Sequence, residues 1–306
     1  MNKIWLLLVD HVRRDFHATA YACTGAFLIA SLAFNYAINF EDNYLDTLPD
    51  LTRFAAYLVW HSLAWFVPVM SVGYFKKLQP LLWSKTFLGT SVFALVLLSL
   101  DRVLPFVSQT IISFFHPLTH YYLIKLANNL SGLVVLVFPL LAYYLLYHRN
   151  QGHFYGLRPG GISLRPYLVL LLLMLPVLVA AAFLPGFQAQ YPMYHKTPAD
   201  VYWQWPAWAT ATVYEISYAL NFVAVEFFYR GFLVLGMAAW LGRSSVLCMS
   251  VLYCFLHFGK PLPEAISSIA GGYILGVISF ETRSIWGGIL VHIGIAWTME
   301  FLGFII

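Results

Sequence analysis

The chain has 306 residues, of which 61 % are hydrophobic, 18 % aromatic and only 10 % charged, and its mean hydropathy is +0.74. Soluble domains carry about 25 % charged residues, so this composition excludes an ordinary soluble protein and predicts a polytopic membrane protein. The formal charge of +4 comes from lysine and arginine residues clustered in short loops, which indicates membrane topology and no binding to nucleic acid.

Apolar stretches in the first two thirds of the chain predict five membrane-spanning helices, because a span needs about 20 mainly apolar residues. We expect residues 105–125, which contain two prolines and two histidines, to form an interfacial or partly re-entrant segment. Counting lysine and arginine places the N-terminus inside, together with the loops that follow the second and fourth spans. The five expected spans are residues 18–40, 53–75, 86–104, 126–147 and 166–184.

Beyond residue 206 the pattern changes, because polar residues now stand inside the predicted spans. One long helix, or two joined near Asn221, covers about 207–240, and further helices are expected over 244–258, from Pro263 to about 280, and over 284–306. We therefore predict an all-α transmembrane bundle of about eight or nine membrane segments with an intramembrane polar site. The expected parts are N-terminal membrane helices (1–165), a fifth span with an aromatic loop placed outside (166–204), and a C-terminal domain (205–306).

Glu226 and Arg230 stand in a segment that is otherwise almost wholly apolar, residues 221–232. Residues four apart lie on the same face of a helix, so these two side chains can pair. An unpaired charge costs about 2.5–3.5 kcal/mol at the bilayer centre, and intramembrane ionisable residues therefore indicate a functional site. The alternative is an ion pair that only fixes helix packing.

Two histidines, His257 and His292, stand on the next predicted helices and complete a set with Glu226 and Arg230. A buried carboxylate with two imidazoles is what water activation requires, because one group takes the proton while the others orient it and stabilise an oxyanion. Two histidines and a glutamate could also hold zinc, so a metal is left open. Each histidine alone could instead be a core residue bonded to a backbone carbonyl.

Three short motifs resemble the CAAX protease and bacteriocin-processing (Abi) family of intramembrane endopeptidases. They are Glu-Phe-Phe-Tyr-Arg-Gly from Glu226, Tyr-x-x-x-His ending at His257, and His292 in the last helix. The family pattern is Glu-Glu-x-x-x-Arg, then Phe-x-x-x-His, then His-x-x-x-Asn/Asp, and the resemblance covers about residues 205–304. It implies a bundle of transmembrane helices with a glutamate-type site that needs no metal.

Two positions depart from the family pattern by replacing a polar group with an apolar one. Val225 stands where the family has its first glutamate, which is commonly assigned to water activation, and Ala296 stands where asparagine or aspartate is expected. Glu226 cannot simply replace a carboxylate at 225, because one residue rotates a helix by about 100°. Tyr253 in place of phenylalanine is a mild change.

Other polar residues could compensate for these losses. Glu215 lies three helical turns before Glu226 on nearly the same face, and Glu300 lies eight residues after His292, so either could supply a carboxylate. Glu300 could equally be a headgroup-level residue, and Glu215 could only hydrogen-bond to neighbouring tyrosines. Asn221 could bind water or bridge two helices.

The leading hypothesis is an intramembrane endopeptidase-like protein that hydrolyses a peptide or protein delivered from the bilayer. Its catalytic residues would be Glu226, Arg230, His257 and His292, with Glu215, Glu300, Asn221 and Tyr253 as accessory candidates. The alternatives are an inactive relative that acts as a binding, immunity or scaffold protein, and a transporter with a proton relay. The resemblance and the short loops favour a bacterial inner membrane, with the N-terminus in the cytoplasm.

Overall fold

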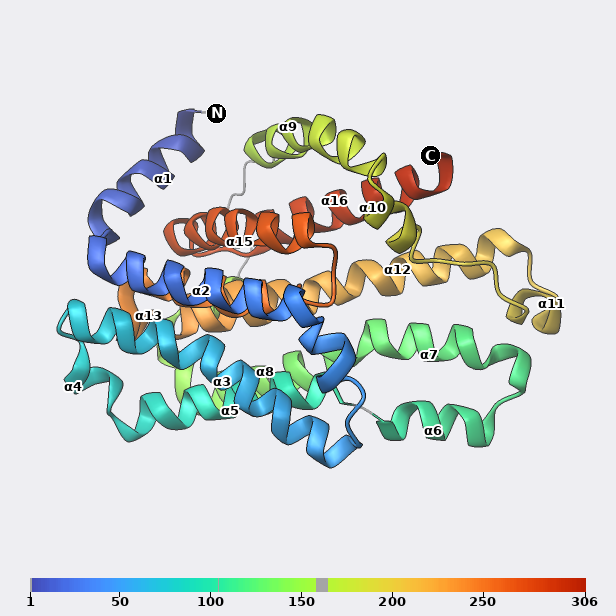
Figure 1. Cartoon of the computed structure of the whole chain (residues 1–306), viewed down its shortest axis with the longest axis horizontal. Helices are drawn as coiled ribbons and strands as arrows, with labels where there is room; N and C mark the ends of the chain where they lie inside the picture. Colours follow the sequence, from blue (N-terminus) through green and yellow to red (C-terminus); the bar gives the residue numbers. More distant parts are fainter. Residues whose placement is uncertain (1, 104, 158–164) are drawn as a thin grey trace.

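The computed structural model describes residues 2–103, 105–157 and 165–306, and in these ranges every regular element is helical (Figure 1). Eight helices of the described residues are long and apolar enough to cross a membrane. Helices are the expected solution, because a bilayer offers no hydrogen-bond partner to an exposed backbone group. The predicted all-α polytopic bundle is therefore confirmed.

Three long helices, α2, α3 and α5, lie side by side in the first half of the chain. Helix α3 packs against both α2 and α5. Short π- and 3₁₀-helical segments are labelled η. The bounds are α1 (Asn2–Asp15), α2 (Ala18–Ile38), η1 (Glu41–Leu45), α3 (Asp50–Phe75), α4 (Gln79–Leu82), α5 (Lys85–Asp101), α6 (Pro105–Phe114), α7 (Pro117–Gly132), η2 (Leu133–Val137), α8 (Phe138–Tyr143), η3 (Tyr144–His148), η4 (Arg149–Gln151) and η5 (Phe154–Gly156).

The fourth span begins earlier than the sequence suggested. It starts at Pro117 and continues without a break to Gln151, so the second half of the expected interfacial segment belongs to this span. Pro117 occupies the first turn of α7, where its missing N–H removes no helical hydrogen bond. The imidazole of His116 caps the same end by accepting a bond from the amide of Leu118 at 3.3 Å. The two prolines therefore start helices here and do not interrupt one.

The second half carries the most buried helices. Its bounds are α9 (Arg165–Ala182), α10 (Pro185–Gln190), α11 (Ala199–Trp203), α12 (Ala207–Glu226), η6 (Phe227–Gly236), α13 (Ala238–Leu241), η7 (Gly242–Ser244), α14 (Ser245–Phe255), α15 (Leu262–Thr282) and α16 (Trp286–Ile305). The predicted boundary loop 148–165 contains η4 and η5, and its residues 158–164 lie outside the described residues, so the division into parts stays a prediction.

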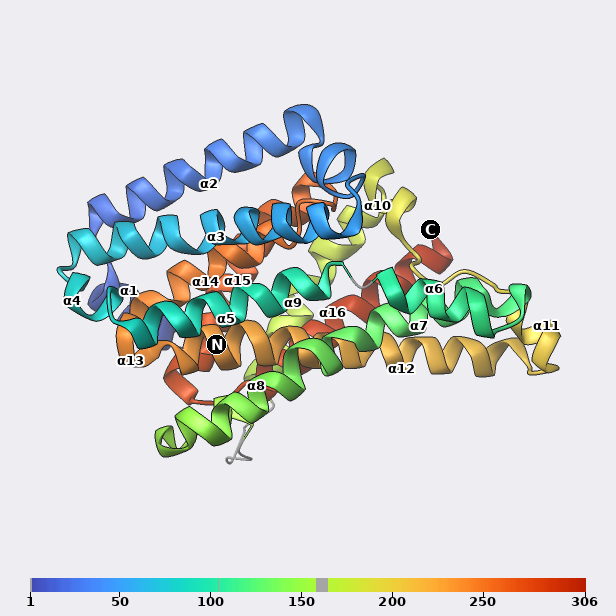
Figure 2. The same cartoon turned by 90° about the horizontal axis from the view of Figure 1, so that it is seen from below.

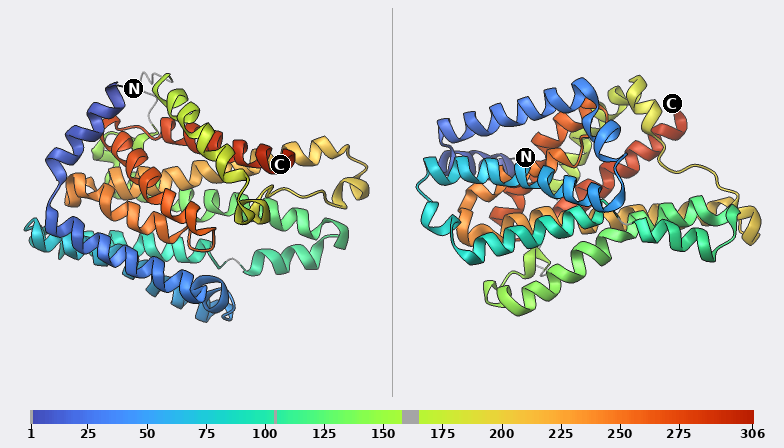
Figure 3. Two further views of the ribbon diagram at one scale, coloured as in Figure 1. Left: turned by 45° about the horizontal axis from the view of Figure 1, so that its top comes forward. Right: turned by 60° about the horizontal axis from the view of Figure 1, so that its bottom comes forward.

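The rod formed by α12 and η6 and the helix α14 lie at the centre of the bundle. In the spans 207–236 and 238–255, which contain these helices, 67 % of an apolar stretch of 18 residues is buried. This share is larger than in any other spanning helix of the described residues. Helix α14 packs against α15, α3 and η6, while α7 runs beside α12 (Figure 2). Helix α9 lies along α16 on the opposite side (Figure 3). Side chains on η6 and α14 are thus covered by other helices, whereas α12 still exposes Trp208 and Ile216.

The loop between α10 and α11 is tied to the C-terminal helices. Tyr191 donates to Glu264 on α15 at 3.4 Å, and the ammonium of Lys260 lies 5.4 Å from the centre of the Tyr191 ring. Burial raises the pKa of Tyr191 well above its ordinary value, so its hydroxyl stays protonated as a donor. The loop is therefore packed onto the bundle.

A π-helical segment, η6, begins directly after Glu226, and all ten of its residues are buried. Such wide turns inside helices occur often at functional sites. Gly231 lets this segment approach η5, because a Cβ atom at position 231 would lie 2.8 Å from the carbonyl oxygen of Tyr155. The ring of Tyr155 in turn packs against Phe227 and Phe232, so the segment 154–156 fits closely on η6.

Replacing Gly231 with valine should destabilise the protein, because the backbone of Tyr155 cannot yield as a side chain would. Overpacking of this kind costs about 1–3 kcal/mol in unfolding free energy. The matched control is Gly271→Val, since nothing lies within 4 Å of a Cβ atom placed there. Unfolding in detergent measures both variants, and an equal loss for both would contradict the close packing of η5 on η6.

Candidate functional site

The site is built on the Glu226–Arg230 pair, where α12 passes into η6. Both side chains are fully buried, and Arg230 Nη1 lies 2.9 Å from Glu226 Oε1. Their spacing of four residues brings the two charges to one face, as the sequence indicated. Because a buried charge without a partner is costly, the pair neutralises both charges within this rod.

His292 on α16 binds the same carboxylate oxygen. Its Nδ1 atom lies 3.0 Å from Glu226 Oε1, so Nδ1 carries the proton and Nε2 is left as an acceptor. Gly288, one turn earlier on α16, makes this approach possible, because a Cβ atom at position 288 would overlap Glu226 Oε2. The ring of Phe222 covers the imidazole with its centre 4.4 Å away.

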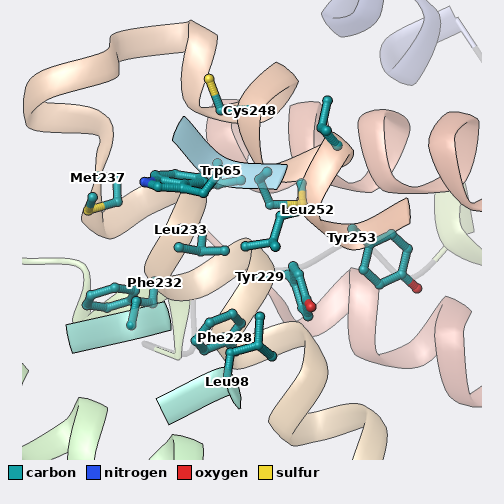
Figure 4. Close-up of a cluster of buried hydrophobic side chains, with 14 of the residues drawn as sticks. Trp65, Leu98, Phe228, Tyr229, Phe232, Leu233, Met237, Cys248, Leu252 and Tyr253 are labelled. Atoms are coloured by element: carbon teal, nitrogen blue, oxygen red, sulfur yellow. The ribbon is translucent and has the colours of Figure 1, made fainter. Parts of the chain in front are cut away.

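Tyr253 on α14 joins the two sides of the site. Its hydroxyl lies 3.2 Å from His292 Nε2, to which it donates if Nδ1 is protonated, and its ring lies under the Arg230 guanidinium at 4.2 Å. Figure 4 shows Tyr253 at the edge of the buried core, with its hydroxyl oxygen pointing away from Trp65. Arg230, Glu226, His292 and Tyr253 therefore form one continuous chain of contacts.

His257 reaches the site through Tyr253. Its Nδ1 lies 2.9 Å from the carbonyl oxygen of Tyr253, and the two rings meet edge to face at 4.7 Å. Donation from Nδ1 to this carbonyl fixes the tautomer and leaves Nε2 as the basic nitrogen. Among the described residues His257 has no direct hydrogen bond to Glu226 or His292, but it is only half buried and lies on the accessible side.

Two polar groups of the site retain unused hydrogen-bonding capacity. Within the described residues, Glu226 Oε2 is buried with no hydrogen-bond partner, and the same holds for Nε, Nη1 and Nη2 of Arg230, although Nη1 makes the ion contact with Glu226. Buried polar groups are nearly always bonded, so such exceptions require an explanation. A polar ligand or water bound beside the pair would satisfy them.

The accessory carboxylates lie elsewhere. Both oxygens of Glu300 accept backbone N–H bonds, from Met193 at 2.7 Å and Tyr194 at 3.2 Å, so Glu300 tethers the loop after α10. The structure does not bring it to His292. Glu215 is half buried, and its Oε2 has no hydrogen-bond partner in the described part of the chain. It has no recorded contact with either site histidine there.

Apolar packing fills the two positions where the chain departs from the family pattern. Val225 packs against the main core, and Ala296 lies in a cluster with Tyr194, Tyr214 and Tyr218. Asn221 faces α7, with its Oδ1 3.7 Å from a Cβ atom built on Gly132. None of these three residues adds a hydrogen bond to the Glu226–His292 pair within the described ranges.

Metal binding has no structural support in the described ranges, which contain no cluster of three or more His, Cys, Asp or Glu side chains that could hold an ion. The feature that sequence reasoning missed is the Gly288 contact. Tyr253 was an accessory candidate from the sequence, where it stands in place of the phenylalanine of the family pattern, and its hydroxyl lies 3.2 Å from His292 Nε2. The Gly288 contact had no signal in the sequence, since it depends on how α16 crosses α12.

One comparison with known proteins gives a match. Residues 203–298 match the family model described as type II CAAX prenyl endopeptidase Rce1-like. No curated protein and no solved structure matches the chain. The matched segment runs from the end of α11 into α16 and contains every member of the contact chain described above.

Arg230→Met should lower the unfolding free energy by about 3–5 kcal/mol, because it leaves the Glu226 carboxylate buried without its cation. Adding Glu226→Gln removes that charge, so the double variant should lose less than the sum of the two single variants. Arg14→Met is the control, since its pair with Asp10 is exposed and should be worth less than about 1 kcal/mol. Strict additivity of the two site variants would contradict a coupled buried pair.

Proposed function

The chain belongs to the CAAX protease family through its domain at residues 203–298, and on this basis we propose that it is an intramembrane endopeptidase. It would hydrolyse a peptide bond of a peptide or protein delivered from the bilayer. The observation that carries this proposal is the hydrogen bond between Glu226 and His292 at 3.0 Å, with the Tyr253 hydroxyl on the opposite nitrogen of the same ring.

In the proposed reaction His257 Nε2 is the general base. It takes a proton from a water molecule, whose oxygen then forms a bond to the scissile carbonyl carbon. For the oxyanion to be stabilised, the single O–H proton of Tyr253 would turn from His292 Nε2, to which it donates in this structure, to the substrate oxygen. The C–N bond then breaks, and His257 returns the proton to the leaving nitrogen. Proton transfer of this kind contributes about 10²–10⁴-fold to a rate.

Access to the site favours the side on which the histidines lie. Glu226 and Arg230 have no exposed surface, whereas the His292 side chain is 15 % exposed and His257 is half buried. A substrate would therefore meet the two imidazoles first, with the ion pair behind them. This arrangement agrees with the proposed roles, in which the ion pair orients the site and the histidines contact the reacting atoms.

A binding protein without catalysis is the second candidate function. Val225 and Ala296 favour it, because both pack against apolar or tyrosine side chains where the family pattern has polar groups. In that case the peptide would bind at the same site and dissociate without being cleaved. Zinc is not needed by either candidate, although chelation is a simple control.

Hydrolysis can be tested with purified protein in lipid vesicles and two quenched fluorescent peptides. One ends in a farnesylated cysteine followed by three residues, and the other is an apolar peptide without a lipid. We expect cleavage of at least one, with kcat/KM at least about 100-fold lower for His257→Ala and Glu226→Gln. Glu281→Gln, which removes a carboxylate paired with Arg243, should stay within about twofold of the wild type. Binding of either peptide without cleavage would instead support the second candidate.

We further propose a bacterial inner membrane as the location, from the family resemblance and the short loops, and a cytoplasmic N-terminus, from the distribution of lysine and arginine. In a Cys23→Ala background, a membrane-impermeant thiol reagent should label Tyr44→Cys in intact cells. It should label Arg14→Cys only after the cells are opened. Both positions are exposed, and the reverse pattern would overturn this orientation.

A further inference from the structure

The connection between α14 and α15 carries His257 and receives three hydrogen bonds from α2. Tyr36 donates its hydroxyl to the carbonyl oxygens of Lys260 at 2.7 Å and His257 at 3.2 Å. Asn35 donates its amide to the carbonyl oxygen of Phe258 at 3.1 Å. These donors stand more than 160 residues before the segment that matches the family, so a separate part of the chain holds the histidine.

Asn35 is itself fixed from both ends. It is 1 % exposed, and its Oδ1 atom accepts the backbone N–H of Glu41 at 3.0 Å. The Glu41 side chain pairs with Arg102 directly after α5. Because its acceptor and its donor are both used, the Asn35 amide has a single orientation, and the donor it offers Phe258 is held rigidly.

The connection has local backbone hydrogen bonds, such as the one from the Lys260 N–H to the His257 carbonyl at 3.0 Å, and the donors from α2 add to them. Residues 256–259 form turns and not a regular helix, and Phe258 is buried. Within the described residues, Asn35 is the one side chain bonded to the Phe258 carbonyl. The Phe258 ring is also held, since it stacks on Phe255 at 4.5 Å and meets Tyr36 edge to face at 6.2 Å. Removing the α2 donors would take the side-chain partners from the Phe258 and Lys260 carbonyls, whereas the His257 carbonyl would keep the backbone N–H of Lys260 at 3.0 Å. The turn would relieve the lost bonds by shifting.

We propose that Asn35 and Tyr36 are positioning residues, which hold the turn after α14 so that the His257 imidazole stays against Tyr253. The N-terminal helices thus complete the site from outside the family-matched domain. The predicted effect on rate rests on the proposed endopeptidase function. The predicted effect on the orientation of the imidazole does not.

Tyr36→Phe is the sharpest test, because it keeps the ring and removes only the hydroxyl. A small displacement of a catalytic group lowers kcat strongly, so we expect a fall of about 10- to 100-fold with KM within about twofold. The control is Tyr44→Phe, an exposed tyrosine on η1 that should leave kcat and KM unchanged. The cleavable peptide of the vesicle assay is the substrate.

Histidine-selective ¹⁵N labelling supplies a second readout that needs no activity. The ring resonances of His257, assigned with His257→Gln, should move in Tyr36→Phe and Asn35→Ala. Those of His61, which is buried against Ser99 far along α3, should not move. If the His257 resonances stay in place in both variants, the proposal is wrong. Equal movement of His61 would show general loosening and would overturn it as well.

The two readouts separate this proposal from the function on which it builds. If the wild-type protein cleaves neither peptide but the His257 ring still responds to Tyr36→Phe, the endopeptidase function fails and the positioning role stands. If cleavage occurs and Tyr36→Phe changes neither kcat nor the ring resonances, the function stands and the positioning role fails.

Discussion

Burial of the Glu226 carboxylate against the Arg230 guanidinium is the constraint on which the rest of the site depends. Neither charge touches lipid or solvent, so each needs the other within contact distance. The pair neutralises both charges within the central rod, and the carboxylate then orients His292 on α16 by accepting a hydrogen bond from its Nδ1. Tyr253 completes this chain of contacts, because its ring lies against the Arg230 guanidinium while its hydroxyl contacts the His292 imidazole.

In this arrangement Tyr253 has a larger role than the replacement of phenylalanine by tyrosine in the motif suggests. Two positions that are polar in the family pattern are apolar here, and the structure fills them by packing. Tyr253 supplies a hydroxyl next to His292 that a phenylalanine could not supply. Because that hydroxyl donates its one proton to His292 Nε2, it would have to turn away from the imidazole to meet a developing oxyanion. The chain keeps a donor near the second histidine from a different helix.

The sequence predicted what depends on local spacing. Apolar length gave the membrane spans, and the spacing of four residues gave the Glu226–Arg230 pair. It did not predict what depends on how helices cross. Glu300 shares a helix with His292, yet the loop after α10 folds back and takes both of its oxygens. The start of α7 was misplaced because Pro117 can either end or begin a helix, and only its capping partner His116 decides between them.

The central claim is that this site activates water, and isotope incorporation during peptide cleavage tests it most directly. Wild-type protein would act on the vesicle-borne peptide in H₂¹⁸O, and the products would be weighed by mass spectrometry. The account predicts one ¹⁸O atom in the new C-terminal carboxyl group, and a much lower yield of that product from Tyr253→Phe. Intact peptide recovered without ¹⁸O, under conditions in which it binds, would contradict the account.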